Sequence, residues 1–305
     1  MHESREPTGH TGVMIGIVTR NRLAKLTETL HECLSRGFGR IAVLDNASTD
    51  GTGACLRNFP GIDVLSLENN IGGAGGFSEL MRYFVEKSDC GWLLLFDDDA
   101  HPAFESAQLD AFLASQAGHE SAAYALRVVR PEGGLCPMNI PGRNILLRHP
   151  LRLGRYHLAG HEPDCDVDFS SFVGLLLSRE TIRNVGLVSP KFFLYSDDTY
   201  YTLSISRKLG PLRYHPGLPL VHDCARSSPR LPWHSPERVR RSIINKIVVI
   251  REYSRYPVSY CLLYCLRLLL ANPCMAPQVL RGVLCGLREN CAEYRNLPLP
   301  DLPSR

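Results

Sequence analysis

Four short apolar runs alternate with helix-forming segments between residues 13 and 96 of this 305-residue chain. The runs are rich in leucine and β-branched residues, which predicts buried strands at residues 13–19, 41–44, 62–67 and 92–96. Leucine spacing and flanking glycines predict helices at residues 23–36, 52–58 and 79–87. Strands that alternate with helices form a mostly parallel sheet flanked by helices. The sequence therefore predicts an α/β fold.

Polar residues follow each predicted strand at the point where it ends. In open parallel sheets, ligands bind beyond the carboxyl ends of the strands, so these residues should share one rim. This rim makes the first half of the chain a predicted nucleotide-binding unit. The four groups are Thr19, Arg20 and Asn21; Asp45 and Asn46; Glu68, Asn69 and Asn70; and Asp97, Asp98 and Asp99.

The acids Asp97, Asp98 and Asp99 stand at the end of the most apolar run. Adjacent carboxylates repel one another and lose solvation beside a buried strand, and a hard divalent cation with oxygen ligands removes both penalties. Alternate residues of an extended segment point the same way, so Asp97 and Asp99 should face one ion while Asp98 faces elsewhere, such as a ribose hydroxyl. A solvated acidic turn is the alternative, and the neighbouring rim residues disfavour it.

A single histidine, His222, follows a short apolar stretch late in the chain. A lone histidine is more often a hydrogen-bonding residue than a ligand, but a neutral imidazole can complete a metal site made mostly of oxygens. The other histidines show neither an HExxH pattern nor a paired spacing, so we expect no zinc site.

A second acidic pair, Asp197 and Asp198, precedes a segment with helical periodicity. One of the two acids is a candidate helix N-cap. The other is a candidate general base, because paired carboxylates near a cation can hold well-separated pKa values and an acceptor hydroxyl must lose its proton as it attacks. Two acids at a helix start without any catalytic role are the alternative.

A glycine-rich segment at residues 70–77 precedes the third predicted helix. Glycines let the backbone approach a ligand closely, and a helix that starts near Phe77 or Ser78 would offer free N–H groups to phosphate or sugar oxygens. Neither the Walker spacing nor the dinucleotide-binding spacing is present. The candidate donor-binding residues of this segment are Asn70, Gly72, Gly73, Gly75, Gly76 and Phe77.

Composition places few limits on partners. The formal net charge of +3 indicates no nucleic-acid partner. The eleven cysteines form no CxxC pair, and the first ten residues hold no apolar stretch, so we expect reduced thiols in a cytoplasmic protein.

The C-terminal part, residues 231–305, differs from residues 1–230 and is predicted to be a helical region. Its apolar run at residues 258–271 is shorter than the ~20 residues of a spanning helix and contains Arg267. Either it packs on the main domain, or it lies in a membrane interface as a peripheral contact. Nearby arginines could face an anionic membrane or form a solvated helix face: Arg226, Arg230, Arg238, Arg240 and Arg241.

These motifs, in this order, resemble the inverting family-2 glycosyltransferases of the GT-A fold, a Rossmann-like architecture. The resemblance covers about residues 13–223. The glycine-rich segment is similar to the branch that holds galactofuranosyl- and rhamnosyltransferases of bacterial cell-surface glycans. The matching pieces are residues 17–22, 44–52 and 96–99, the pair Asp197 and Asp198, and His222.

The resemblance implies a role for each of these pieces. Thr19, Asp45 and Asn46 would hold the base and ribose of a nucleotide-diphosphate sugar, and the glycine-rich segment would lie along its sugar and diphosphate. Mn²⁺ or Mg²⁺ would bind Asp97, Asp99 and His222. Asp198 would activate the acceptor hydroxyl.

The implied activity is transfer of galactofuranose from UDP-galactofuranose to a saccharide or lipid-linked saccharide in bacterial cell-surface polysaccharide synthesis, including O-antigen. A dTDP-rhamnose-dependent rhamnosyltransferase is the alternative, and a nucleotide-sugar-binding protein without turnover is the non-enzyme alternative. A nucleotidyltransferase is disfavoured because no glycine-rich loop follows the first strand. The protein would work in the cytoplasm or peripherally at the inner face of the cytoplasmic membrane, in an oligomeric state that the sequence leaves open.

Overall fold

A computed structural model describes residues 12–118, 121–149, 163–223 and 235–299 of the chain. Within these residues, nine strands form one mixed sheet. Its path is β3-β2-β1-β4-β8-β6-β9-β5, and β7 pairs with β9. The strands are β1 Val13–Thr19, β2 Ile41–Asp45, β3 Ile62–Ser66, β4 Trp92–Asp97, β5 Ala100–Pro102, β6 Ala123–Val129, β7 Cys165–Val167, β8 Leu175–Ser178 and β9 Leu212–His222.

The four strands predicted from the sequence form the parallel half of this sheet. β1 lies between β2 and β4, and β2 pairs with β3, all in parallel. The register places Thr19 beside Asp45 and Val18 beside Asp97. The predicted common rim at the carboxyl ends of these strands is therefore confirmed.

The other half of the sheet is mixed. β8 runs antiparallel to both β4 and β6, β9 runs parallel to β6, and β5 runs antiparallel to β9. For residues 118–168, the several Pro and Gly residues indicate loops and short strands, and the structure places β6 and β7 there. Pairing between β5 and β9 joins segments more than a hundred residues apart, which no local pattern reveals.

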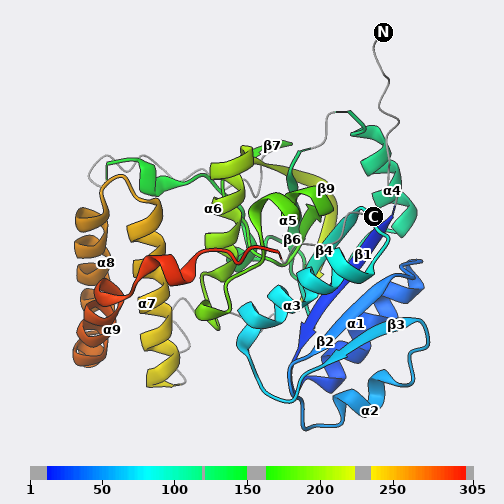
Figure 1. Ribbon diagram of the computed structural model, residues 1–305, viewed down its shortest axis with the longest axis horizontal. Helices are drawn as coiled ribbons and strands as arrows, with labels where there is room; N and C mark the ends of the chain where they lie inside the picture. Colours follow the sequence, from blue (N-terminus) through cyan, green and yellow to red (C-terminus); the bar gives the residue numbers. More distant parts are fainter. Residues whose placement is uncertain (1–11, 119–120, 150–162, 224–234, 300–305) are drawn as a thin grey trace.

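Helices cover both faces of the sheet, as Figure 1 shows. Alternate residues of β1 divide between two cores, because successive side chains of a strand point to opposite faces. Met14 packs with α3, whereas Ile15 packs with α1 and α4. The helices are α1 Leu23–Ser35, α2 Thr52–Leu56, α3 Gly72–Lys87, α4 Ser106–Ser115, α5 Arg179–Val185, α6 Asp197–Leu209, α7 Pro236–Tyr253, α8 Pro257–Ala271 and α9 Ala276–Arg288.

Helix α3 begins at Gly72, earlier than the predicted start near Phe77 or Ser78. The glycines therefore form the first turns of a helix rather than a loop. A Cβ on Gly76 would lie 2.7 Å from a methyl carbon of Val18, and one on Gly72 would lie 2.1 Å from the carbonyl oxygen of Phe193. Close contact with the sheet and with the Phe193 backbone explains these two glycines.

Substitution of Gly72 by alanine is expected to lower the free energy of unfolding by about 1–3 kcal/mol, the penalty for a strained backbone position. Gly72 has φ +77°, and the added methyl group would also overlap Phe193. Chemical denaturation measures the change. Gly39→Ala is the matched control, because nothing lies within 4 Å of a Cβ there. Equal stability of the two variants would contradict this account.

The C-terminal helices α7, α8 and α9 lie at the end of the molecule opposite to β2 and β3 (Figure 1). Glycines let α9 approach α7 closely: Gly282 faces Ile243, and Gly286 faces Ile247. Buried residues of these helices belong to the same hydrophobic cluster as the core beneath α3. The apolar run at residues 258–271 thus forms a helix that packs on the domain through one side.

Within the part of the chain that the structure describes, no single helix has the length and apolar composition needed to cross a membrane. Helix α8 together with Pro273–Arg288 meets both criteria as a pair that is bent by 115°.

Candidate functional site

Three side chains from distant parts of the chain converge beyond the carboxyl end of β4. One ligand atom from each of Asp97, Asp99 and His222 lies within 4.8 Å of the other two. Asp99 and His222 are buried. Two carboxylates and one imidazole are ligands that a divalent cation accepts, and the oxygen-rich set suits Mn²⁺ or Mg²⁺. The three residues predicted to bind a metal are thus together and could hold one.

The orientation of His222 fits a metal ligand. The pairing of β5 with β9 sets Ala100 opposite His222, which brings Nε2 of the imidazole to 3.1 Å from Oδ1 of Asp99. On the other side of the ring, Nδ1 lies 2.8 Å from Oδ1 of Asn139. Since an amide oxygen only accepts, Nδ1 carries the hydrogen, and Nε2 is directed at the carboxylates. A second partner that fixes the ring in this way is usual for histidine ligands.

The middle acid, Asp98, is held by residues of β1 and the start of α1. The hydroxyl of Thr19 donates to Oδ2 of Asp98 at 2.7 Å, and Nε of Arg22 lies 3.1 Å from Oδ1. Arg22 also reaches Oδ2 of Asp99 at 2.5 Å. Each oxygen of Asp98 has one partner from the protein and can accept a further hydrogen bond, so the predicted contact with a ribose hydroxyl remains a prediction.

Burial disfavours the ionised forms of Asp97 and Asp98. It raises the pKa of Asp97 to about 6 and that of Asp98 to about 7. Burial acts to lower the pKa of His222, but the hydrogen bonds with Asp99 and Cys136 and the charges of Asp99 and Asp97 together raise it to about 10. A bound cation would favour the ionised carboxylates, so the electrostatics of the cluster agree with a metal site.

Without added metal, the protein is expected to lose stability as pH rises from about 5 to about 7. The folded state keeps protons on Asp97 and Asp98 that the unfolded chain, with an Asp pKa of about 3.9, has released. Unfolding then releases protons and is favoured by higher pH, and the raised pKa of His222 acts with the same sign.

Mn²⁺ binds ionised carboxylates, so its stabilising effect should be larger at about pH 7 than at about pH 5. Thermal unfolding at both pH values, with and without Mn²⁺, measures this difference. A Mn²⁺ effect on Tm that is independent of pH would contradict a site built on these acids. Asp99→Asn is the control variant, in which the Mn²⁺ effect should disappear.

The second acidic pair opens helix α6. Asp197 and Asp198 are the first two helical residues, and Ser196 is the N-cap. The prediction that one of the two acids is the N-cap is therefore wrong. The turn that precedes them is unusual, since Phe193, Tyr195 and Ser196 all have positive φ, at 59°, 72° and 63°. Non-glycine residues rarely adopt this conformation, and surrounding contacts must hold it.

Asn245 of α7 holds that turn. Its side-chain nitrogen donates to the carbonyl oxygens of Phe192, Leu194 and Tyr195, at 2.9, 2.8 and 2.9 Å. Asn245 is buried, so the loss of these bonds would leave a polar group without water. One amide of the C-terminal region thus fixes where the acidic helix begins.

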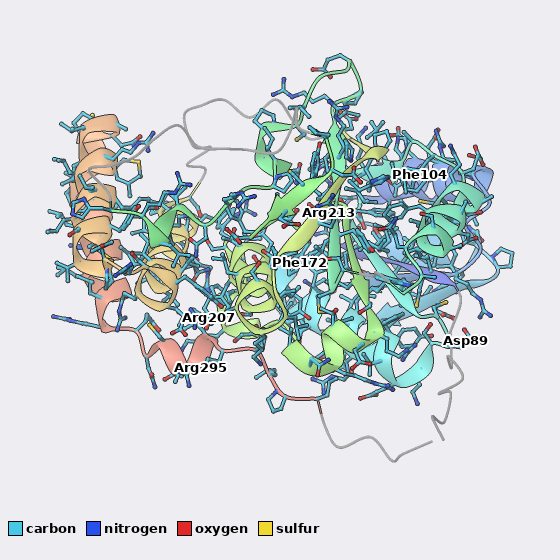
Figure 2. The ribbon with its side chains drawn as sticks, turned by 90° about the horizontal axis from the view of Figure 1, so that it is seen from above. Asp89, Phe104, Phe172, Arg207, Arg213 and Arg295 are labelled. Carbon is cyan, nitrogen blue, oxygen red and sulfur yellow. The ribbon has the colours of Figure 1, made fainter. Side chains whose placement is uncertain are left out.

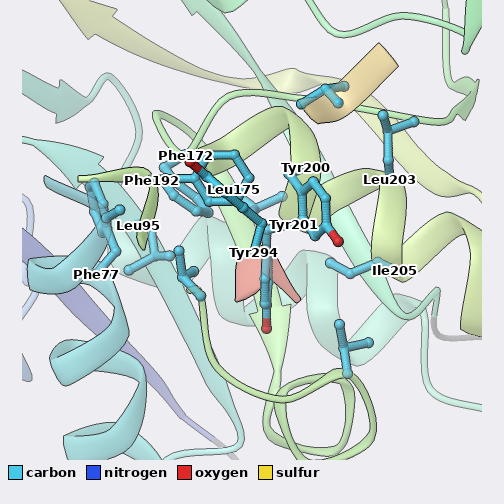
Figure 3. Close-up of a cluster of buried hydrophobic side chains, with 14 of the residues drawn as sticks. Phe77, Leu95, Phe172, Leu175, Phe192, Tyr200, Tyr201, Leu203, Ile205 and Tyr294 are labelled. Carbon is cyan, nitrogen blue, oxygen red and sulfur yellow. The ribbon is translucent and has the colours of Figure 1, made fainter. Parts of the chain in front are cut away.

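Aromatic packing fixes the rest of helix α6. Tyr200 packs against Phe192 with ring centroids 5.0 Å apart, and Tyr201 packs against Phe172 at 6.1 Å (Figure 3). Both tyrosines are buried. The first turns of α6, which carry the two acids, are therefore held in position by buried aromatic side chains.

Asp198 is held in a defined orientation at this helix start. Its Oδ1 accepts hydrogen bonds from the backbone N–H of Thr199 at 2.6 Å and from the Thr199 hydroxyl at 3.3 Å. Burial raises the pKa of Asp198, and the positive charge of Lys246 acts in the opposite direction. The charge of Asp198 also raises the pKa of Asp97. The charges of the two acidic groups therefore act on each other.

The remaining rim residues are mostly engaged with the backbone. Oδ1 of Asp45 accepts from the N–H of Ser48 at 2.9 Å. Asn46 bonds to Ile71 and Gly72, which ties the end of β2 to the start of α3. Their predicted contacts with base and ribose remain predictions.

Two more polar rim residues also bond to nearby backbone. Oδ1 of Asn21 accepts from the N–H of Thr49 at 2.7 Å. Asn70 accepts from the N–H of Gly72 at 3.0 Å. Arg20 is exposed. Arg20, Asn21 and Asn70 border the rim, and their contacts with a nucleotide likewise remain predictions.

Within the glycine-rich segment, only the first residues face the rim. Phe77 is buried in the core, 4.6 Å from Phe172 between ring centroids (Figure 3). A Cβ on Gly75 would meet the side chain of Ile71 at 2.8 Å. The residues best placed for a donor are Gly72 and Gly73, and among the described residues nothing accepts a hydrogen bond from the N–H of Gly73.

Four residues of the site were not among the predicted site residues: Arg22, Asn139, Asn245 and Lys246. Arg22 lies within residues 17–22, one of the pieces that carry the family resemblance, so its position was the one available clue. Asn139 ends a short 3-10 helix, and Asn245 and Lys246 lie on α7, far from the acids in sequence. Only the tertiary contacts bring them to the site.

The chain was compared with protein families and with proteins of known sequence or structure. The model of the family described as Glycosyl transferase family 2 matches residues 14–173, just over half of the chain. No curated relative matches the sequence.

Similar folds are found among solved structures. GalNAc-T7 with UDP, GalNAc and Mn²⁺ has a TM-score of 0.56 at 13% identity, with coverage of 78% of this chain and 47% of that one. S. aureus TarS 1-349 has a TM-score of 0.54 at 14% identity, with coverage of 93% and 83%. Its complex with UDP-GlcNAc has a TM-score of 0.52 at 13% identity, with the same coverage. The present chain thus spans less than half of the GalNAc-T7 chain, and at these identities the likeness concerns the fold.

Proposed function

The chain belongs to glycosyl transferase family 2, and we propose that it transfers galactofuranose from UDP-galactofuranose to a saccharide acceptor, by direct displacement with inversion at the anomeric carbon. The observation that carries this proposal is the cluster of Asp97, Asp99 and His222, whose ligand atoms lie within 4.8 Å of one another, with the charge of Asp198 acting on Asp97. Such a site provides a general base that can deprotonate the acceptor and a cluster that can stabilise the leaving diphosphate.

Asp198 removes the proton from the acceptor hydroxyl. Thr199 occupies its Oδ1, which leaves Oδ2 for the acceptor. Burial raises the pKa of Asp198, which makes its carboxylate more basic than that of an exposed aspartate. Asp97, Asp99 and His222 would hold Mn²⁺ or Mg²⁺, which when bound supplies positive charge against the leaving diphosphate.

A UDP donor is supported by what two similar folds bind. GalNAc-T7 is described with UDP and Mn²⁺, and S. aureus TarS with UDP and with UDP-GlcNAc. Support for galactofuranose comes from the glycine-rich segment at residues 70–77. At the rim, the N–H of Gly73 is available to a sugar or phosphate oxygen.

The acceptor in this proposal is a saccharide or lipid-linked saccharide of bacterial cell-surface polysaccharide synthesis, met at the cytoplasmic face of the membrane. Residues 1–230 would bind the donor and catalyse transfer, and residues 231–305 would approach the acceptor or membrane. The support is a set of exposed apolar side chains on α8 and α9: Val258, Leu262, Leu266, Leu270, Leu280, Leu284 and Leu287. Arg238 and Arg240 on α7 are also exposed, whereas Arg226 and Arg230 lie outside the described residues.

A donor screen tests the proposal. The release of UDP or dTDP is followed with a saccharide acceptor in the presence of Mn²⁺, Mg²⁺ or a chelator. Metal-dependent release from UDP-galactofuranose is the expected result. Release from dTDP-rhamnose would replace the donor, and tight nucleotide binding without release from any donor would favour a binding protein without turnover.

A further inference from the structure

A cavity of about 670 Å³ lies between helices α6, α7 and α8. This volume is in the range of sites that bind small molecules. Thr199 of α6, the residue that holds Asp198, is part of its wall, as is Lys246 of α7. The cavity therefore extends from the neighbourhood of the proposed catalytic base toward α8, which Figure 2 shows at the far end of the molecule.

Most of the cavity wall is apolar. Phe169, Leu203 and Val249 line it from the domain side, and leucines of α8 line it from the other. Two of these leucines, Leu266 and Leu270, are also exposed at the surface. The cavity is thus continuous with the exposed apolar face of α8, so an apolar chain could enter it from that face.

Two positive charges line this apolar cavity. Lys246 is half-buried, and no residue in the described ranges forms a hydrogen bond or ion pair with its ammonium group; burial lowers its pKa, and the charge of Asp198 acts in the opposite direction. Arg267 of α8 lines the same cavity. The described lining residues include no aspartate or glutamate. Arg267 is exposed and Lys246 is half-buried, so a phosphate group at this wall could bond to both side chains.

We propose that this cavity binds the lipid portion of the acceptor, a hydrocarbon chain that carries a phosphate group. The chain lies against the leucines of α8, the phosphate bonds to Lys246 and Arg267, and the hydroxyl-bearing end points toward Asp198. The orientation toward Asp198 rests on the proposed glycosyl transfer, whereas binding of the amphiphile rests on the cavity alone. A bilayer surface by itself would contact the exposed leucines but would not fill the cavity that Lys246 lines.

Isothermal titration calorimetry with the full chain tests this proposal, with monomeric decyl phosphate, decanol and inorganic phosphate as probes. Decyl phosphate should bind at least about tenfold more tightly than either of the others, since only it satisfies both the apolar wall and the cations. Lys246→Met should remove this advantage over decanol. UDP binding with Mn²⁺, measured in the same samples, reports separately on the donor site.

Leu266→Glu and Leu284→Glu form a matched pair, since both leucines are 53% exposed and only Leu266 lines the cavity. Leu266→Glu should weaken decyl phosphate binding about tenfold or more, while Leu284→Glu should leave it unchanged. Equal effects in the two variants, or binding of decyl phosphate no tighter than that of phosphate or decanol, would overturn the proposal. Failure of UDP to bind would count against the proposed function and would leave the cavity result intact.

Discussion

Replacement of Asp198 by asparagine is expected to lower kcat for sugar transfer by about 10²–10⁴-fold, the usual contribution of a general base. Asparagine keeps the shape of the side chain and can still accept a hydrogen bond from Thr199, but it cannot take the acceptor proton. The affinity for UDP in the presence of Mn²⁺ should stay near that of the wild-type protein, because Asp198 is not among the three residues that could hold the metal. Steady-state kinetics and UDP titration measure the two quantities.

Asp89→Asn is the control for this substitution. Asp89 is exposed, and its Oδ2 lies 3.3 Å from Nη2 of Arg40, which is exposed as well. Figure 2 shows Asp89 far from α6. The control should retain wild-type kcat. A kcat for Asp198→Asn within a few-fold of the control would show that Asp198 is not the base. A loss of UDP binding that parallels the loss of kcat would show that Asp198 contributes to donor binding instead.

Replacement of Asp99 by asparagine is expected to abolish Mn²⁺-dependent activity. Asp99 is one of three residues that converge on the metal position, and it also bonds to His222 and Arg22. Changes in the partners of metal ligands alone weaken metal affinity by about 10–100-fold, so loss of a ligand should exceed that range. Calorimetric titration with Mn²⁺ in the presence of UDP gives the affinity directly.

The same titration with Asn139→Ala distinguishes the loss of a metal ligand from the loss of a residue that orients a ligand. Asn139 bonds to Nδ1 of His222 and would not touch the metal, so its loss should weaken Mn²⁺ binding by about 10–100-fold without abolishing it. Wild-type Mn²⁺ affinity in Asp99→Asn would show that the cluster is not the metal site. Unfolding curves for both variants establish that each protein remains folded.

The parallel half of the sheet could be predicted from the sequence because its strands are short, apolar and separated by helices. β1 has the predicted bounds, and the ends of β2, β3 and β4 differ from the prediction by one residue. The start of α3 was placed too late, since glycine disfavours helix locally and close packing against Val18 and Phe193 outweighs that preference here. Ser196 became the cap of α6 because Asn245 holds the preceding turn.

The sequence by itself determined which polar groups lie at the rim, because Thr19, Asp45 and Asp97–99 end or follow strands whose apolar patterns are local and strong. Tertiary structure decided which other groups join them. The pairing of β5 with β9 brings His222 to Asp99, and the packing of α7 against α6 brings Lys246 near Asp198. Contacts between residues far apart in the chain depend on the path of the whole backbone, which no single segment encodes.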